Sequence, residues 1–339
     1  MNDIGKKRAG ANEGRAQLSP KRWFQAVSGV LLLAASLTVS AQNWPARTVR
    51  VVVGTAPGGG VDLMARALAQ PLSDLLGQPV AIDNRAGGSG NLAAVEIIRS
   101  TPDGYNLLFG PMTQQTVNPS LIKGSPNSAK DLVPVGLIGR SQLHLVTKKD
   151  LPANSVADLV KLAKSKPGTI TYSSSGVGTS PHLLGELFQK QAGISLLHVP
   201  YKGSGPALLS ALAGETDIAF ITGVAYQHVR AGRLNLLAVA SDKRASEFPQ
   251  VPTMIEAGYK EIVFDAWIGI WAPAATPPAV LERLSKALAD ACNQPAVIKK
   301  FNDFNAEAKF VDSAGFRLML EKETQTMSVL VKERNISAD

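Results

Sequence analysis

The chain has 339 residues, with 35 Lys and Arg, 27 Asp and Glu, and a formal net charge of +8 at pH 7. Residues 1–41 hold six basic and two acidic side chains, so the rest of the chain carries a net charge of about +4. A charge that small, without an arginine-rich stripe interleaved with aromatics, excludes a dedicated nucleic-acid-binding protein.

Residues 1–41 have the pattern of a cleaved export signal. All six basic residues lie before residue 23, and an apolar run follows over residues 26–39. That run is shorter than the ~20 residues that span a bilayer, and Val39-Ser40-Ala41 matches a small-x-small cleavage site. We therefore predict a signal peptide over residues 1–41, cleaved after Ala41, and a periplasmic protein. An uncleaved membrane anchor is the alternative.

The single cysteine, Cys292, excludes an internal disulfide. It lies in a segment with helical periodicity, residues 280–293, which predicts a buried structural thiol. Secreted eukaryotic proteins of this length usually have several cysteines, so the cysteine count favours a bacterial periplasmic protein.

From Trp44 onward, strand-like and helix-like segments alternate. The first series consists of strand 49–53, helix 62–76, strand 80–82, helix 91–100 and strand 106–109. Such alternation predicts a parallel sheet with helices on both faces. A long extended stretch over residues 136–147 then predicts a strand that leaves this lobe and enters a second one.

A second series of the same kind follows. Ser155 and Asp158 form a start signal like a capping box. The segments are helix 155–165, strand 170–173, helix 181–192, strand 196–199, helix 205–214, strands 218–221 and 236–240, a returning extended run 264–272, and helices 277–294 and 313–333. We predict an α/β protein with two lobes, residues 42–143 with 262–339 and residues 144–261. Each lobe has a mostly parallel sheet flanked by helices, and two crossover strands join them.

Two strand–turn–helix openings, one in each predicted lobe, match each other. Residues 54–60 are Gly-Thr-Ala-Pro-Gly-Gly-Gly, and residues 174–180 are Ser-Ser-Gly-Val-Gly-Thr-Ser. Small-residue turns at a helix start expose backbone N–H groups, and the helix dipole adds positive potential. At the carboxyl ends of sheet strands, both turns would face the cleft and hold an anion from two sides. Ordinary tight turns that use Gly for positive φ are the alternative.

Several sequence blocks in a fixed order make the chain similar to one family. The blocks are residues 52–62 with Ala65-Arg66, residues 83–91, Pro102-Asp103-Gly104-Tyr105, residues 172–182 with Gly185-Glu186-Leu187-Phe188, residues 198–203, Val251-Pro252-Thr253 with Glu256-Ala257-Gly258, and Ala272-Pro273-Ala274 before Thr276-Pro277. With them the chain resembles the substrate-binding receptors of tripartite tricarboxylate transporters, the Bug-type receptors. The family's first loop usually reads proline-phenylalanine-proline-proline-glycine-glycine, whereas Gly54, Thr55 and Ala56 stand in its first three places here.

The resemblance implies a fold of the periplasmic binding protein type II-like class, whose two lobes close around a ligand. It implies a small carboxylate as that ligand: a dicarboxylate or tricarboxylate, an acidic amino acid or an aromatic acid. Large and small membrane subunits would be the partners. We expect no cofactor, no enzymatic activity and a monomer.

The turns and the resemblance together give a set of candidate ligand-binding residues. They are Pro57, Gly58, Gly59, Asp62, Thr113, Gln114, Ser174, Ser175, Gly176, Gly178, Thr179, Ser180, His182, Tyr201, Lys202 and Gly203. Backbone N–H and hydroxyl groups can satisfy the lone pairs of one carboxylate.

Several of these residues have a second interpretation. Asp62 would either cap its helix or contact a ligand ammonium, and Lys202 would either add charge to the cleft or be a solvated surface residue. Tyr201 would close over an apolar part of the ligand or pack at the rim. His182 and Glu186 share a helix face, but no third metal ligand lies at recognisable spacing, so we predict no metal site.

Two other functions fit parts of the sequence. Residues 88–93 match the loose G-x-G-x-x-A fingerprint, but they follow the second strand, and no acidic residue ends the next one. The chain has no G-x-S-x-G, H-E-x-x-H or Walker lysine motif, so a secreted α/β enzyme is the weaker alternative. An orphan binding protein that serves a sensor needs the same clamp and is the stronger one.

Overall fold

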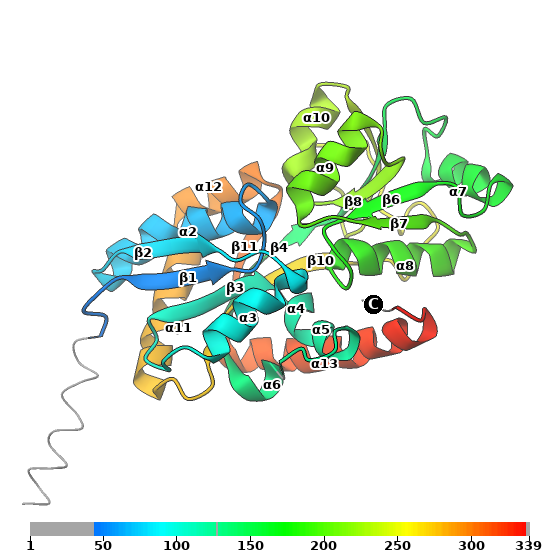
Figure 1. The fold of residues 1–339 in the computed structure, drawn as a ribbon. Helices are drawn as coiled ribbons and strands as arrows, with labels where there is room; N and C mark the ends of the chain where they lie inside the picture. The colour runs from blue at the N-terminus through cyan, green and yellow to red at the C-terminus, as the bar shows by residue number, and fades with distance from the viewer. Residues whose placement is uncertain (1–43, 127, 337–339) are drawn as a thin grey trace, which may run out of the picture. The chain divides into compact units, whose positions relative to one another are not determined.

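The strands of residues 45–339 form two sheets in the computed structural model, which describes residues 44–126 and 128–336 (Figure 1). In the first sheet the order is β11 (Ala306–Asp312), β4 (Leu132–Gln142), β10 (Asp265–Pro273), β3 (Asn106–Pro111), β1 (Val49–Val53), β2 (Val80–Asn84). In the second it is β7 (Leu197–Pro200), β6 (Thr171–Ser174), β8 (Ile218–Ile221), β5 (His144–Lys148), β9 (Leu234–Val239). The predicted signal peptide and its cleavage site lie outside the described residues.

Each sheet combines a parallel half with an antiparallel half. In the first sheet β1 pairs in parallel with β2 and β3, and in the second β6 pairs in parallel with β7 and β8. The strands nearest the crossings, β4 and β10 in one sheet and β5 in the other, pair antiparallel with their neighbours. This confirms the predicted α/β fold with two lobes, and its parallel character is confined to the strands that carry the βα units.

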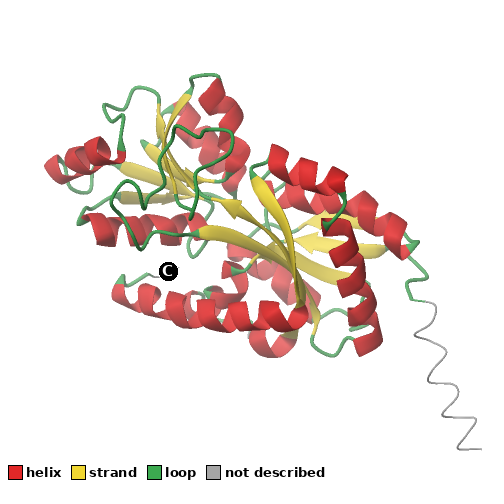
Figure 2. Ribbon diagram, turned by 180° about the vertical axis from the view of Figure 1, so that it is seen from behind, coloured by secondary structure: helices red, strands yellow, loops and turns green. Residues whose placement is uncertain are grey.

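Helices flank both sheets (Figure 2). Those next to the first sheet are α2 (Gly60–Leu76), α3 (Asn91–Ile98), α11 (Pro278–Cys292), α12 (Pro295–Asp303) and α13 (Ser313–Glu333). Those next to the second are α7 (Val156–Ser165), α8 (Ser180–Ala192), α9 (Ser204–Ala213) and α10 (Tyr226–Arg230). Short turns complete the set: η1 (Gly88–Gly90), α4 (Thr113–Thr116), α5 (Asn118–Leu121), α6 (Ser128–Asp131) and η2 (Gly223–Ala225).

The parallel halves of the two sheets have the same topology. In the first, α2 connects β1 to β2 and α3 connects β2 to β3; in the second, α8 connects β6 to β7 and α9 connects β7 to β8. In each sheet the first connection leads to the neighbouring strand on one side, and the second leads back to the strand on the other side. Because both crossovers are right-handed, the two helices lie on opposite faces of the sheet. The loops at the carboxyl ends of β1 and β6 thus occupy corresponding places.

Local sequence explains where the helices begin and end. Buried residues of α2, including Met64, Leu68 and Leu72, recur at helical spacing, and the helix ends at Gly77, whose φ of 73° suits glycine. At the start of α7, Ser155 Oγ accepts the Asp158 N–H at 3.1 Å, as the predicted capping pair requires. Cys292 is buried, its Sγ 3.6 Å from the Ile138 carbonyl oxygen, which confirms the predicted structural thiol.

Two segments join the sheets, and one helix contacts both. The predicted strand 136–147 is two strands, β4 and β5, that meet at the fully buried Leu143, and the predicted return run is β10. The helix α13 packs Phe316 into the core of the first sheet, while Met327, Leu330 and Val331 join the apolar cluster of the second. Within the described part of the chain, no helix has the length and apolarity needed to cross a membrane.

Candidate functional site

A cavity of about 380 Å³ lies where loops of the two sheets meet, within the range of ~300–1,000 Å³ that is usual for ligand sites. Most of its wall comes from the loops that follow β1, β2 and β3 in one sheet and β6, β7 and β8 in the other, and Leu143 and Ala266 of the crossing segments complete it. All six strands belong to the parallel halves of their sheets. The cavity therefore lies at the carboxyl ends of parallel strands, the usual place for ligands in open α/β sheets.

Three helices begin at this cavity. Gly60 opens α2, Ser180 opens α8 and Ser204 opens α9, and all three residues line the wall. The first N–H groups of a helix have no partner within the helix, and the dipole makes that end positive. Three such ends around one cavity favour an anion.

The loop after β2 has an unusual backbone. Gly87, Gly88, Ser89 and Gly90 have consecutive φ values of 134°, 54°, 52° and 92°. Ser89 is in the left-handed region without being glycine, which costs free energy and needs support from its surroundings. Ser89 Oγ donates to the Val177 carbonyl oxygen at 2.7 Å, so this loop touches the loop after β6 across the cavity.

Three buried polar atoms in the cavity wall have no hydrogen-bond partner among the described residues. They are Gln114 Oε1, Thr55 Oγ1 and Thr222 Oγ1. The Gln114 side chain is enclosed by glycines: a Cβ at Gly90 would lie 2.2 Å from its Nε2, and one at Gly110 would lie 2.4 Å from its Oε1. All three atoms are shielded from solvent, so a molecule in the cavity does not reach them in this arrangement.

Most of the candidate residues from the sequence line this cavity. They are Gly59, Gln114, Ser175, Gly176, Thr179, Ser180, Tyr201, Lys202 and Gly203. Lys202 is exposed, and it is the one charged residue among the described residues of the wall.

The remaining candidates do not line the cavity. They are Pro57, Gly58, Asp62, Thr113, Ser174, Gly178 and His182. Asp62 is 1% exposed, and its carboxylate accepts hydrogen bonds from the Gly58 N–H at 2.9 Å, Arg66 Nε at 3.0 Å and Asn84 Nδ2 at 3.0 Å. Burial alone would raise the pKa of Asp62, but these hydrogen bonds outweigh it and hold the pKa below its usual value. Asp62 therefore supports the turn and does not face the cavity.

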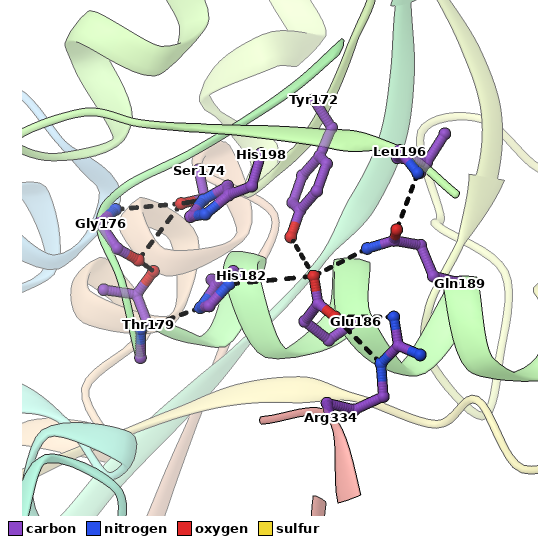
Figure 3. Close-up of polar contacts among 11 residues, drawn as sticks. Tyr172, Ser174, Gly176, Thr179, His182, Glu186, Gln189, Leu196, His198 and Arg334 are labelled. Atoms are coloured by element: carbon purple, nitrogen blue, oxygen red, sulfur yellow. Dashed lines mark hydrogen bonds and ion pairs between the residues drawn. The ribbon is translucent and has the colours of Figure 1, made fainter. Parts of the chain in front are cut away.

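His182 supports the second turn (Figure 3). Its Nδ1 accepts the Gly178 N–H at 3.0 Å, and its ring stacks on that of His198 with centroids 4.0 Å apart. His198 Nε2 lies 2.6 Å from Ser174 Oγ at the end of β6. Burial lowers the pKa of His182 to about 4 and that of His198 to about 3, so both rings are neutral at pH 7.

Glu186 joins this support to the end of the chain (Figure 3). Its carboxylate accepts hydrogen bonds from Tyr172 Oη at 2.9 Å, Gln189 Nε2 at 2.7 Å and Arg334 Nε at 3.0 Å. His182 Nε2 lies 4.0 Å from Glu186 Oε1. No group of three His, Cys, Asp or Glu side chains that could hold a metal ion occurs in residues 44–126 and 128–336.

Several residues of the cavity wall are absent from the candidate set. They are Gly54, Thr55, Gly60, Gly87, Gly88, Ser89, Gly90, Ser204 and Thr222. A signal existed for two of these groups: residues 87–90 form a third glycine-rich turn after a predicted strand, and Thr222 directly follows the predicted strand 218–221. The rule that ligands lie at the carboxyl ends of strands applies to both.

Comparison with known proteins gives a consistent result. The family described as "Tripartite tricarboxylate transporter family receptor" matches residues 64–336. Protein BugT of Bordetella pertussis is 37% identical over 314 residues, which cover 91% of this chain and 96% of the relative.

Solved structures are similar over most of the chain. Periplasmic binding protein BugD has a TM-score of 0.82 at 29% identity, covering 87% of this chain and 99% of that one. The Rpa4515 protein of R. palustris, solved with adipate, has a TM-score of 0.83 at 31% identity, with coverages of 87% and 99%. MatC from Rhodopseudomonas palustris, with bound malate, has a TM-score of 0.80 at 27% identity, with coverages of 85% and 100%.

Proposed function

Because this chain belongs to the tripartite tricarboxylate transporter family receptors, we propose that its cavity captures the carboxylate group of a small organic acid. The family is one of solute-binding receptors and not of enzymes. Two of the similar structures are named for adipate and malate, which are small carboxylates.

The observation that carries the proposal is the meeting of three helix N-termini at one cavity. The starts of α2, α8 and α9 all contribute to the wall, and the wall residues that the structure describes include no acidic side chain. N–H groups aimed at a carboxylate stabilise it without a buried cation. The modest net charge of the chain is therefore compatible with anion binding.

Contacts between the loops suggest how the ligand is retained. Ser89 bonds to Val177, and a Cβ at Gly203 would lie 3.4 Å from Ala56 Cβ, so loops of the two sheets touch around the cavity. A ligand that contacts both sides favours the arrangement in which they meet. Exclusion of water then strengthens its hydrogen bonds. The moving bodies would be the predicted lobes, residues 42–143 with 262–339 and residues 144–261.

The N-terminal sequence and the family support a cellular location and a transport partner for this receptor. We propose that residues 1–41 direct export, that cleavage follows Ala41, and that the receptor works in the periplasm as a monomer. Its ligand would be delivered to large and small membrane subunits of a tripartite transporter.

A thermal-shift screen tests the proposed function. Residues 45–339 form a compact unit, so the chain from Gln42 is the protein to use. An acid present at ~100 times its Kd should stabilise the fold by ~2.7 kcal/mol. If no member of a broad panel of mono-, di- and tricarboxylates, acidic amino acids and aromatic acids raises Tm, the proposed function is wrong.

Lys202 offers a milder test of the site. Because its charge is exposed, Lys202→Gln should weaken acid binding only about two- to fivefold. The exposed Lys260, which does not line the cavity, gives the matched control, and Lys260→Gln should leave the Kd unchanged.

A further inference from the structure

We infer that Asn118 is a positioning residue for ligand binding, which holds two glycine-rich turns of the cavity wall in place from outside the cavity. The first is the turn of residues 87–90 after β2, and the second is the turn of residues 175–178 after β6. All of the first turn and residues 175–177 of the second line the cavity, whereas Asn118 does not. The inference rests on the proposed function and extends it to a residue that the ligand does not touch.

The turn after β2 needs support because of its backbone conformation. Its four residues, 87–90, all have positive φ, from 52° to 134°. Successive backbone N–H groups in a turn can form a concave site for an anion. Ser89, at 52°, is the member with a side chain, and a non-glycine residue keeps such a conformation only where its surroundings fix it. Strain of this kind is typical of ligand-binding loops.

Asn118, the first residue of α5, supplies this support. It is 1% exposed, and its Nδ2 donates to the Ser89 carbonyl oxygen at 3.0 Å and to Asn91 Oδ1 at 2.9 Å. Both hydrogens of the amide are therefore used on the strained turn and on the residue that follows it. Asn91 Oδ1 also accepts a hydrogen bond from Ser125 Oγ at 3.2 Å, so this acceptor is itself held in place. The Asn118 amide thus fixes the carbonyl group of the one non-glycine residue in the turn.

The turn after β6 rests on the same short helix. A Cβ at Gly178 would lie 2.7 Å from Leu121 Cδ1 and 3.5 Å from Asn118 Oδ1. Leu121 belongs to the apolar cluster of the second sheet, although α5 follows β3 of the first. The Nδ2 atom of Asn118 therefore bonds to one turn while its Oδ1 lies beside the other, so a change at this residue affects both.

A direct bond between the two turns completes the arrangement. Ser89 Oγ donates to the Val177 carbonyl oxygen at 2.7 Å. That bond needs Ser89 in its present position, which Asn118 holds. Three contacts therefore fix this part of the wall without a ligand: Asn118 with Ser89, Ser89 with Val177, and Gly178 with α5. A wall that is fixed in advance spares the ligand the free-energy cost of ordering it.

NMR relaxation of the unliganded chain from Gln42 tests the positioning role without a ligand. In the parent, the backbone amides of residues 88–91 should be rigid, with order parameters of about 0.85. In Asn118→Ala they should fall below about 0.6, because the turn loses the side chain that fixes it. The amides of β1 should keep the parent's values. An equal fall in β1, or no fall at residues 88–91, would overturn the inference.

Isothermal titration calorimetry measures the consequence for binding. Adipate and malate are the first probes, followed by citrate, glutamate and benzoate if neither binds. Asn118→Ala should weaken the acid that binds by about 10- to 30-fold, since binding must then order the turn. A Kd within about twofold of the parent's in the folded variant would overturn the inference.

Asn235 supplies the matched control. It lies on β9 and is partly buried, and its Nδ2 also donates to a backbone carbonyl oxygen, that of Lys149, at 3.2 Å. Since β5 runs antiparallel to β8, Lys149 lies at the end of the sheet opposite to the cavity residue Thr222. Asn235→Ala should therefore change the Kd less than about twofold and leave the order parameters of residues 88–91 unchanged.

A double-mutant cycle shows whether Asn118 acts through Ser89. Glycine adopts a φ near 52° without the cost that serine carries, so the turn in Ser89→Gly needs less support. In that background Asn118→Ala should weaken acid binding less than about threefold, against about 10- to 30-fold in the parent. The same loss in both backgrounds would overturn the inference, because a merely structural role does not depend on Ser89.

Further variants keep both proposals testable. Asn118→Leu, which keeps the side-chain volume, replaces Asn118→Ala if that variant does not fold. If neither folds, Ser89→Ala at its partly buried position removes the bond to Val177 and should weaken acid binding about three- to tenfold, and an unchanged Kd would overturn the inference. Failure of every acid in the wider panel would remove the proposed function instead, and the order parameters would still decide the role of Asn118.

Discussion

The turns after β1 and β6 share the backbone conformation of their last two residues but have different chemical support. Gly58 and Gly178 have φ values of 78° and 76°, and the residues that follow them, Gly59 and Thr179, are extended N-caps of α2 and α8. In each turn the glycine N–H donates to a side chain four residues later. The acceptor is Asp62 Oδ2 at 2.9 Å in one turn and His182 Nδ1 at 3.0 Å in the other.

The two turns also differ in the residues one helical turn further along α2 and α8. Asp62 pairs with Arg66, which is half exposed, whereas His182 is followed by Glu186, which pairs with Arg334 at the C-terminal end of α13. One turn thus rests on an ionised carboxylate and the other on a neutral imidazole. A turn of this kind therefore has a hydrogen-bond acceptor four residues after its glycine. Either a charged carboxylate or an uncharged imidazole can serve as that acceptor.

Removal of His182 should have the largest effect on stability. His182→Ala loses the acceptor for Gly178 and the stacked contact with His198, so the free energy of unfolding should fall by about 3 kcal/mol. Asp62→Ala should cost less, about 2 kcal/mol, because Arg66 can turn toward water. Urea unfolding of both variants measures the difference, and a larger loss in Asp62→Ala would contradict the comparison.

Acidification should weaken only the turn supported by imidazole. The pKa of His182 is about 4 in the folded protein against an ordinary 6.5, so at pH 5 the unfolded chain binds a proton that the folded chain does not. Between pH 7 and pH 5 this group should therefore cost about 2 kcal/mol of stability. The pKa of Asp62 is lowered from 3.8, so its contribution is retained until the pH falls below about 4.

Two variants check this pH dependence. His182→Gln keeps an acceptor without a titrating ring, and it should lose about 2 kcal/mol less than the parent between pH 7 and pH 5. Asp62→Asn should follow the parent over the same range. Equal pH profiles for the parent and His182→Gln would show that the imidazole support has been assigned wrongly.

The two glycines should respond unequally to alanine. Both have positive φ, so each substitution costs about 1 kcal/mol in backbone strain. A Cβ at Gly58 meets nothing within 4 Å, but one at Gly178 would lie 2.7 Å from Leu121 Cδ1. Gly178→Ala should therefore lose about 2 kcal/mol in total and Gly58→Ala about half of that. Equal unfolding midpoints would mean that Leu121 moves aside freely.

The smallest loss of stability should follow removal of the ion pair between Arg334 and Glu186, close to the turn after β6. Arg334→Gln removes one partner of Glu186, which keeps its hydrogen bonds from Tyr172 and Gln189, so we expect a loss of about 1 kcal/mol. Lys190→Gln, which breaks a pair with Glu333 at the exposed surface, is the control and should cost less than about 0.5 kcal/mol. A larger loss of unfolding free energy in Lys190→Gln than in Arg334→Gln would contradict this prediction.

Much of the fold could be predicted because its signals are local. The apolar run of β1, the helical spacing of α2 and the capping pair Ser155 and Asp158 each depend on a few neighbouring residues. The strand β11 was not predicted, since it is a half-exposed strand at the sheet edge with little apolar pattern. The separate helix α12 was not predicted either.

Less of the site than of the fold could be predicted from the sequence. Asp62 was predicted either to cap its helix or to contact the ligand, and His182 to contact the ligand, but in the structure each accepts the N–H group of a glycine four residues earlier. Only the three-dimensional path of the chain decides which face of a turn a side chain occupies. The enclosure of Gln114 by Gly54, Gly90 and Gly110 brings together three segments separated in sequence, so no local pattern reveals it.

The reach of α13 has a consequence for engineering the protein. Met327, Leu330 and Val331 insert into the core of the second sheet, although the same helix starts on the first. The two sheets are therefore connected at three places: the junction of β4 and β5, the run that leads into β10, and the C-terminal part of α13. Shortening the chain ahead of Met327 would uncover an apolar surface and free Glu186 from Arg334, so fusions and truncations should leave the last turns of this helix intact.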